Sequence, residues 1–68
     1  MKEEWTGNLV GRMHNADVTF EELGAEVGWG KPYISMILNG QRSPDGAQKK
    51  LEEAFDEIIR KRKTKNHV

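Results

Sequence analysis

The chain has 68 residues, of which 35% are apolar and none is cysteine, so we expect one small domain that is stabilised by helix packing without a disulfide or a thiolate zinc site. Eleven basic and eleven acidic residues cancel, whereas nucleic-acid binders usually carry a basic excess. The first residues lack the pattern of a signal peptide and no apolar run could span a bilayer, so a cytoplasmic protein is expected.

The charges are unevenly distributed along the chain. Residues 27–44 contain Lys31 and Arg42 but no acid, and residues 60–68 contain five bases and no acid. A local basic face can bind phosphate even when the whole molecule is neutral. The charge pattern is therefore compatible with nucleic-acid binding, although it does not by itself indicate it.

The first helix is predicted to cover residues 2–13. Trp5, Leu9 and Met13 follow one another at intervals of four residues, which places them on one helix face. Gly7 and Gly11 lower the helix propensity of this segment, so packing against the rest of the molecule has to stabilise it.

A second helix is predicted to begin after Thr19 and to end at Gly28, which tolerates a positive φ. Thr19 and Glu22 have the spacing of a capping box, in which each side chain bonds the other residue's backbone N–H. Val18 precedes the box and fits a hydrophobic staple. The apolar stripe of this helix consists of Phe20, Leu23 and Val27.

A third, short helix is predicted to follow, with Pro32 in its first turn and Gly40 as its C-terminal signal. One side of this helix is apolar and consists of Ile34, Ile37 and Leu38. At 100° per residue, the opposite side carries Pro32, Ser35, Met36 and Asn39, with Tyr33 on the flank.

Ser43 and Pro44 have the residue types of an N-cap and a first helical position, so a fourth helix is predicted to begin there and to run to about residue 62. Its inner face consists of Ala47, Leu51, Phe55, Ile58 and Ile59. Its exposed face is expected to hold two ion pairs at i, i+4, namely Asp56 with Arg60 and Glu57 with Lys61.

Together these elements predict an all-α fold, a compact bundle of four or five helices with a helix-turn-helix unit at residues 19–39. The domain is expected to cover residues 1–63, and residues 64–68 are expected to form a flexible tail.

From Val18 to Pro44 the sequence resembles the helix-turn-helix family of phage repressors and Cro proteins (XRE-like). The stretch ISMILNGQRSP follows EELGAEVG at the family's spacing, and the matching residues are Thr19, Glu22, Leu23, Gly28, Tyr33, Ile34, Ser35, Ile37, Asn39, Gly40, Arg42 and Pro44. The resemblance implies a lambda-repressor-like DNA-binding domain of a short phage or prophage transcriptional regulator, either a repressor or a Cro-like protein.

The outward side of the third helix is the candidate site. The candidate base-reading residues are Lys31, Pro32, Tyr33, Ser35 and Met36, and the family's base-reading positions map onto all of them except Tyr33. Met36 and Pro32 suit contacts with thymine methyl groups, Ser35 can hydrogen-bond several bases, and Lys31 can reach guanine or a phosphate. The candidate contacts to the sugar-phosphate backbone are Thr19, Asn39, Gln41 and Arg42.

One such helix offers too little contact area for strong selectivity, so we expect a homodimer on a palindromic or pseudopalindromic double-stranded DNA site. The outer part of the fourth helix, Phe55–Ile59, is the expected dimer interface.

Two positions depart from the family's pattern. Many relatives carry a phosphate-binding glutamine where this chain has Phe20, so that contact is expected to be lost or replaced by backbone N–H groups at the helix start. A buried arginine–glutamate pair that is common in the family corresponds here to Met13 and Leu38. An apolar contact between these two side chains is therefore predicted.

Other interpretations stay open. The third helix could belong to a protein-interaction module, such as an antirepressor or accessory protein, that keeps the fold without reading DNA. The basic residues 60–65 are either a solvated helix end or phosphate contacts. Trp5 and Trp29 are expected in the core or at its rim, and Trp29 could also touch the DNA backbone.

Nothing in the sequence favours an enzyme, a metal site or a cofactor. Four carboxylates of the fourth helix are expected to be solvated surface charge, namely Glu52, Glu53, Asp56 and Glu57. His14 and His67 have no partner at metal-ligand spacing.

Overall fold

The computed structural model describes the backbone of residues 4–66 and the side chains of residues 4–63. This part of the chain is all-helical, with α1 (Glu4–Ala16), α2 (Phe20–Val27), α3 (Lys31–Leu38) and α4 (Ala47–Asn66). No fifth helix occurs within residues 4–66. None of these helices is long and apolar enough to cross a membrane.

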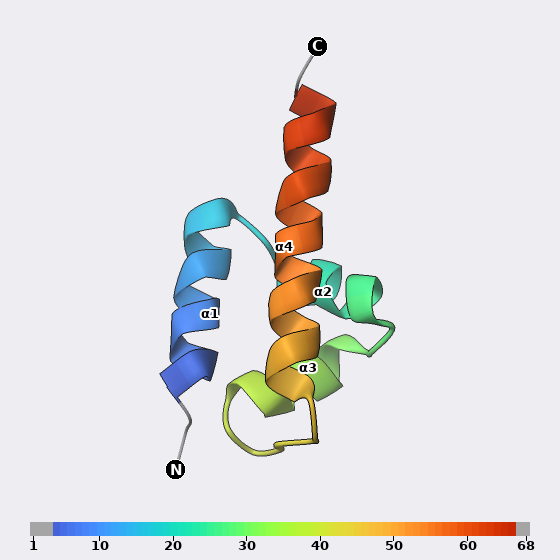
Figure 1. Ribbon diagram of the computed structural model, residues 1–68. Coiled ribbons are helices and arrows are strands. Elements are labelled where there is room, and N and C mark those ends of the chain that lie inside the picture. The colour runs from blue at the N-terminus through green and yellow to red at the C-terminus, as the bar shows by residue number, and fades with distance from the viewer. Residues whose placement is uncertain (1–3, 67–68) are drawn as a thin grey trace.

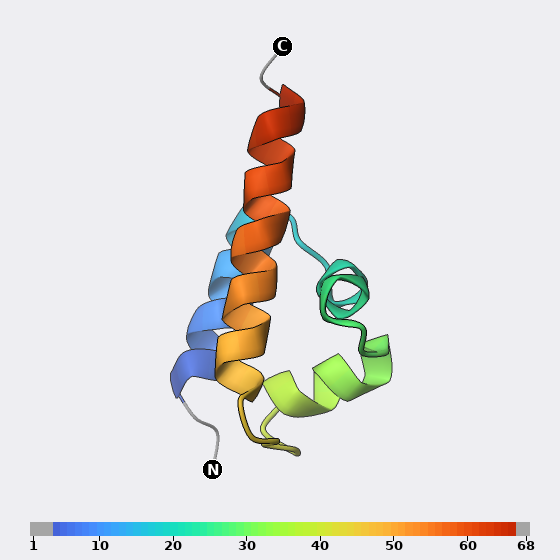
Figure 2. The same cartoon turned by 45° about the vertical axis from the view of Figure 1, so that its right-hand side comes forward.

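Helices α1 and α4 lie side by side and run in the same direction, as Figure 1 shows. Helix α2 packs against α4, and α3 packs against α1 and α2 at the end of the molecule where α4 begins (Figures 1 and 2). The C-terminal turns of α4 extend beyond the other helices, and the molecule is accordingly elongated, with extents of 43 × 21 × 18 Å.

All four helices contribute to one hydrophobic core. Helix α1 supplies the three side chains predicted from its periodicity, and α4 supplies four of the five predicted for its inner face, while Ile59 is half-buried at the edge. Met13 and Leu38 are both buried in this core, where α1 meets α3. The core consists of Trp5, Leu9, Met13, Val18, Leu23, Ile34, Ile37, Leu38, Ala47, Leu51, Ala54, Phe55 and Ile58.

The capping box predicted for α2 is confirmed. The Glu22 backbone N–H donates to Thr19 Oγ1 at 3.0 Å, and the Thr19 backbone N–H donates to Glu22 Oε1 at 3.0 Å. Gly28 ends α2 in the left-handed region at φ 85°, as its position predicts.

Helix α1 is longer than predicted, because it continues past Met13 to Ala16. It ends on Asp17, which adopts φ 58° and lets the Val18 N–H donate to the Met13 carbonyl at 2.9 Å. Aspartate is one of the few non-glycine residues that enter this region readily. The prediction ended the helix at Met13 because the i, i+4 repeat of Trp5, Leu9 and Met13 ends there.

The predicted start of α4 at Ser43 and Pro44 is wrong, since the helix begins at Ala47. The chain makes a turn before the helix, in which the Ala47 N–H donates to the Pro44 carbonyl and Gly46 adopts φ 76°. The Gly46 carbonyl then accepts the Lys50 N–H at 3.0 Å. The predicted end of this helix at about residue 62 is also wrong, because α4 runs to Asn66. The boundary of the domain at residue 63 stays a prediction. Residues 67 and 68, the remainder of the expected tail, lie outside the described residues.

The ion pairs of α4 differ from the expected i, i+4 pairs. Asp56 pairs with Arg12 of α1 at 3.3 Å, and Lys61 pairs with Glu26 of α2 at 2.9 Å. Glu57 pairs with Arg60 at i, i+3. Helical spacing identified acids and bases on one face, but it did not show that Asp56 and Lys61 pair with residues of neighbouring helices.

Candidate functional site

The outward side of α3 is exposed, as its pattern predicts. Ile34, Ile37 and Leu38 are at most 2% exposed, whereas Lys31, Pro32 and Met36 on the other side are exposed. Tyr33 and Ser35 are half-buried. We call the five candidate base-reading residues, Lys31, Pro32, Tyr33, Ser35 and Met36, the α3 face. Met36, at 37%, is the large apolar side chain that the described residues leave exposed.

The position of α3 relative to α2 depends on Gly24, in the middle of α2. A Cβ atom at this position would lie 2.4 Å from the Trp29 carbonyl oxygen and 3.3 Å from Ile34 Cγ1. Real Cβ atoms do not approach a backbone oxygen this closely, so glycine lets the turn pass directly over α2. The sequence offered a signal for this role, because glycine is unfavourable inside a helix of eight residues.

A side chain of α4 joins the site at the turn between α2 and α3. The Trp29 and Tyr33 rings meet edge to face, with centroids 5.1 Å apart and an interplanar angle of 87°. Lys50 Nζ lies 5.6 Å from the centroid of the Trp29 ring. Lys50 could not be recognised from the sequence as part of the site, because residues 45–59 are rich in acids and only the packing of α4 brings Lys50 beside the turn.

The candidate backbone contacts that follow α3 lie close to its outward side. Asn39, Gln41 and Arg42 are all exposed. The chain turns back here because the Gln41 N–H donates to the Met36 carbonyl at 2.8 Å, with Gly40 at φ 82°. A shallow hollow of about 280 Å³ is lined by Tyr33, Gln41, Arg42, Ser43 and Pro44. The structure therefore brings Tyr33 together with Gln41 and Arg42.

Thr19 stands apart from this group, at the end of α2 that is farther from α3. Its hydroxyl and backbone N–H are both bonded to Glu22, and Glu21 and Glu22 are exposed in the same helical turn. The Thr19 backbone N–H and the Arg62 guanidinium, in that order of importance, lower the pKa of Glu22, so this carboxyl is ionised at neutral pH. A phosphate at Thr19 would therefore lie beside an ionised carboxylate and the Arg62 guanidinium that pairs with it, and the contact from Thr19 stays a prediction.

The basic end of α4 makes contacts within the molecule. The Arg62 guanidinium donates to the backbone carbonyls of Ala16 and Asp17, and to Glu22 Oε2 at 2.9 Å. Lys61 pairs with Glu26. These two bases therefore connect α4 to α2 and to the turn before it.

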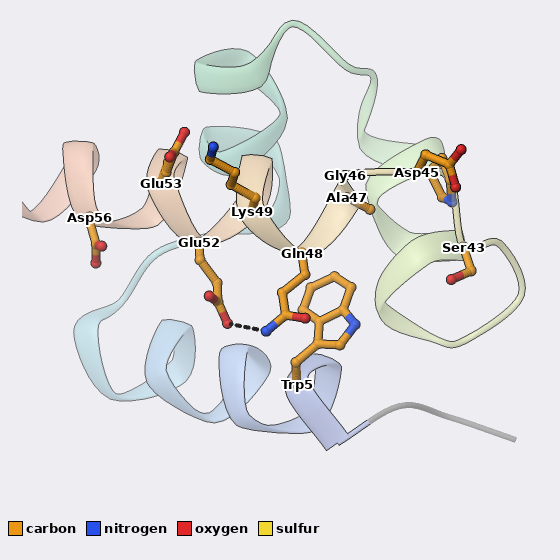
Figure 3. Close-up of a pocket in the computed structure, with 11 residues that line it drawn as sticks. Trp5, Ser43, Asp45, Gly46, Ala47, Gln48, Lys49, Glu52, Glu53 and Asp56 are labelled. Atoms are coloured by element: carbon orange, nitrogen blue, oxygen red, sulfur yellow. Dashed lines mark hydrogen bonds between the residues drawn. The ribbon is translucent and has the colours of Figure 1, made fainter.

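A hollow with a volume of about 640 Å³ lies between the start of α4 and Trp5 (Figure 3). Gln48 Nε2 donates to Glu52 Oε2 at 3.4 Å beside the Trp5 ring, while Glu53 and Asp56 point to different sides of α4. The carboxylates do not converge. Within the described residues no cluster of three or more His, Cys, Asp or Glu side chains is placed to hold a metal ion.

Two apolar residues of the expected dimer interface at Phe55–Ile59 are buried within the monomer and are not available for contact with a second copy. Phe55 is 5% exposed and Ile58 is 7% exposed, and both belong to the core of the monomer. The Arg12 guanidinium also covers Phe55, 4.8 Å from the ring centroid. Helical periodicity showed that these side chains are buried, but not that α1 and α2 bury them.

Comparison with known proteins yields no match to a family model, to a curated protein or to a solved structure. The function of the α3 face therefore has to be inferred from its own residues and geometry.

Proposed function

We propose that this protein binds double-stranded DNA by placing α3 in the major groove, and that it acts as a transcriptional regulator of the phage repressor or Cro-like type. The observation that carries the proposal is the two-sided character of α3. One side is locked into the core, and the other presents Lys31, Pro32, Ser35 and Met36 at the surface. The major groove is about 12 Å wide and admits one such helix.

The chemistry of the α3 face suits base edges. Met36 and Pro32 offer apolar contacts to thymine methyl groups, Lys31 offers a cation to guanine or phosphate, and Ser35 offers a hydroxyl. No acid occurs from residue 27 to residue 44, so the segment that would face the DNA carries no repulsive side chain.

Basic side chains around α3 supply the proposed contacts to the phosphate backbone of the DNA. Arg42 lies after α3 beside Tyr33, and Lys50 lies beside Trp29 at the other end of the helix. Together they would hold the duplex from both ends of α3, fixing register without reading sequence. Gln41 lines the same hollow as Arg42 and contributes a neutral polar group.

The proposal includes a homodimer, because a single α3 covers too few base pairs for strong selectivity. Two copies on half-sites about one helical turn apart would read a palindromic site. Since Phe55 and Ile58 are used by the monomer core, the contact between copies has to involve other residues.

The direct test is selection of bound duplexes from a random-sequence pool, followed by titrations of the selected duplex at several salt concentrations. We expect one sequence to be enriched and its affinity to fall steeply as salt rises, since phosphate contacts release counterions. Failure to bind any duplex at low ionic strength would contradict the proposal.

Arg42→Gln should weaken binding to all duplexes alike and reduce the slope of log affinity against log salt by about 1. Lys63→Gln removes the same charge from an exposed position near the end of α4 and should leave the slope unchanged. The reverse result, with the slope sensitive to Lys63 alone, would move the phosphate contacts from α3 to the end of α4.

A protein-interaction module, such as an antirepressor or accessory protein, is the second candidate. The first turn of α2 favours it, because Glu21 and Glu22 are exposed there. In many proteins of the phage repressor and Cro family, which the sequence resembles, the start of this helix contacts a DNA phosphate, and exposed carboxylates would repel it. Under this alternative no duplex is enriched, and the α3 face binds a partner protein.

A further inference from the structure

Ser35 and Asn39 lie one helical turn apart on the outward side of α3 and are bonded to each other. The Asn39 side-chain Nδ2 donates to Ser35 Oγ at 3.2 Å. The Asn39 backbone is also anchored, because its N–H donates to the Ser35 carbonyl at 2.9 Å in the last turn of the helix. The amide group is thus fixed above the hydroxyl by the geometry of the helix end.

This contact restricts the hydrogen bonds that Ser35 can still make. A serine hydroxyl has one donor and two acceptor lone pairs, and an amide nitrogen can only donate. Asn39 therefore occupies one of the two lone pairs of Ser35 and excludes the O–H from that direction, which leaves the O–H and the second lone pair for the two directions that face away from Asn39. Within the described part of the chain, Ser35 makes no other side-chain hydrogen bond.

We propose that Asn39 is a positioning residue that biases the Ser35 hydroxyl toward donating a hydrogen bond to DNA, by keeping the O–H from turning toward Asn39, so that Ser35 selects against cytosine in the strand it contacts. In the major groove guanine, adenine and thymine each present an acceptor, whereas cytosine presents only its N4 amino donor. This inference rests on the proposed function and gives Asn39 a role in base selection in place of the phosphate contact expected from the sequence.

The test starts from the duplex selected by the wild-type protein. Ser35→Ala identifies the base pair that Ser35 reads, as the position where preference is lost. Dissociation constants are then measured for guanine and cytosine at that position, for the wild type and for Asn39→Asp. The carboxylate of the variant can only accept, so the Ser35 O–H turns toward it and the lone pairs face the base. The preference for guanine over cytosine should fall by about three- to tenfold, as expected for one hydrogen bond.

Two further variants separate this effect from charge and from loss of contact. Gln41→Glu adds the same negative charge two residues away and should weaken both duplexes equally, leaving the ratio of dissociation constants unchanged. Asn39→Ala frees the hydroxyl to rotate, which should bring the ratio between those of the wild type and Asn39→Asp. Far-UV circular dichroism checks that each variant keeps its helices.

The possible failures are distinguishable. If the wild type selects a duplex but Asn39→Asp and Asn39→Ala keep its guanine-to-cytosine ratio, the role of Asn39 is refuted and the proposed function stands. The role of Asn39 is also refuted, and the proposed function stands, if Ser35→Ala reduces the base preference at no position of the selected duplex. If the wild type selects no duplex, both proposals fall.

Discussion

At Gly24 a backbone carbonyl of the following turn occupies the space where a side chain would begin. This contact sets the separation of α2 and α3, and with it the position of the α3 face. The neighbouring glycines of α1 are different, since a Cβ at Gly7 or Gly11 would meet no atom within 4 Å. Glycine is therefore required by packing at Gly24 in α2, whereas at Gly7 and Gly11 in α1 there is room for a side chain.

Gly24→Ala should destabilise the protein by about 1–2 kcal/mol. Because the added Cβ would lie 2.4 Å from a backbone oxygen, the overpacking cost falls in the upper part of the usual range, about 2–3 kcal/mol, and the better helix propensity of alanine offsets about 1 kcal/mol of it. Gly11→Ala, the matched control, should stabilise by about 0.5–1 kcal/mol. Urea denaturation measures both, and a Gly24→Ala protein as stable as the wild type would contradict the close approach.

At the scale of the helices, the first three elements end in the same way. Asp17 and Gly28 adopt a positive φ directly after α1 and α2, at 58° and 85°, and Gly40 does so at 82° one residue further on, after Asn39 at the end of α3. Each end is closed by a backbone N–H that reaches back over the last turn. The start of α2 is closed by its capping box, to which Arg62 of α4 adds an ion pair.

The Glu22 carboxylate makes stability dependent on pH in the acidic range. Its pKa in the folded protein lies below its ordinary value of 4.5, so the stabilisation is present above about pH 4.5 and is lost as the pH falls through the lowered value. Glu22→Gln should therefore be less stable than the wild type at pH 7, by less than about 1 kcal/mol because the side chain is exposed, and the difference should shrink as the pH falls through the lowered pKa.

Denaturation of both proteins across this pH range tests the prediction. Glu21→Gln removes a charge from the same helical turn without touching the capping box, and should give a smaller difference at pH 7. A gap between wild type and Glu22→Gln that stays constant from pH 7 to pH 3 would show that the ionised carboxylate contributes nothing.

Short-range sequence signals predicted the four helices, but not all of their ends. The capping box, Gly28 and the apolar side of α3 were readable because each depends on residues within one or two turns. The start of α4 was predicted too early because Ser43 and Pro44 have the residue types of a helix start. In the structure Gly46 adopts a positive φ in the turn directly before the helix, which begins at Ala47. The exposure of Lys31, Pro32 and Met36 on the outward side of α3 was predictable from the same short-range pattern.

The contacts that complete the site join distant residues or depend on side-chain geometry. Lys50 reaches Trp29, and Arg62 reaches carbonyls 45 and 46 residues earlier in the chain. No periodicity indicates such partners. The bond between Asn39 and Ser35 has a readable i, i+4 spacing, but the spacing does not show which atom donates.

The whole molecule is organised around α4, which contacts both α1 and α2. The radius of gyration is 11.9 Å, compared with about 11 Å for a globule of this length, because the end of α4 projects. Since every helix contributes side chains to the one core, no helix can leave without exposing apolar surface of the others. Unfolding should therefore be a single cooperative transition.

The two tryptophans provide the measurement, because Trp5 lies on α1 beside α4 and Trp29 lies at the α2–α3 turn. In Trp5→Phe and in Trp29→Phe, the remaining tryptophan's fluorescence and the far-UV circular dichroism should give the same urea midpoint within each protein. A separate, earlier midpoint for Trp29 would show that the α2–α3 unit unfolds independently.

The contribution of α4 to the core has a consequence for the order in which the protein can fold during synthesis. A nascent chain that has reached residue 46 already contains α1, α2 and α3, but it lacks Leu51, Ala54, Phe55 and Ile58, on which those helices pack. The surface proposed to read DNA is therefore translated before the scaffold that holds it in shape. A fragment of residues 1–46 should accordingly show no cooperative thermal transition, and sharp melting of that fragment would show that the first three helices need no such support.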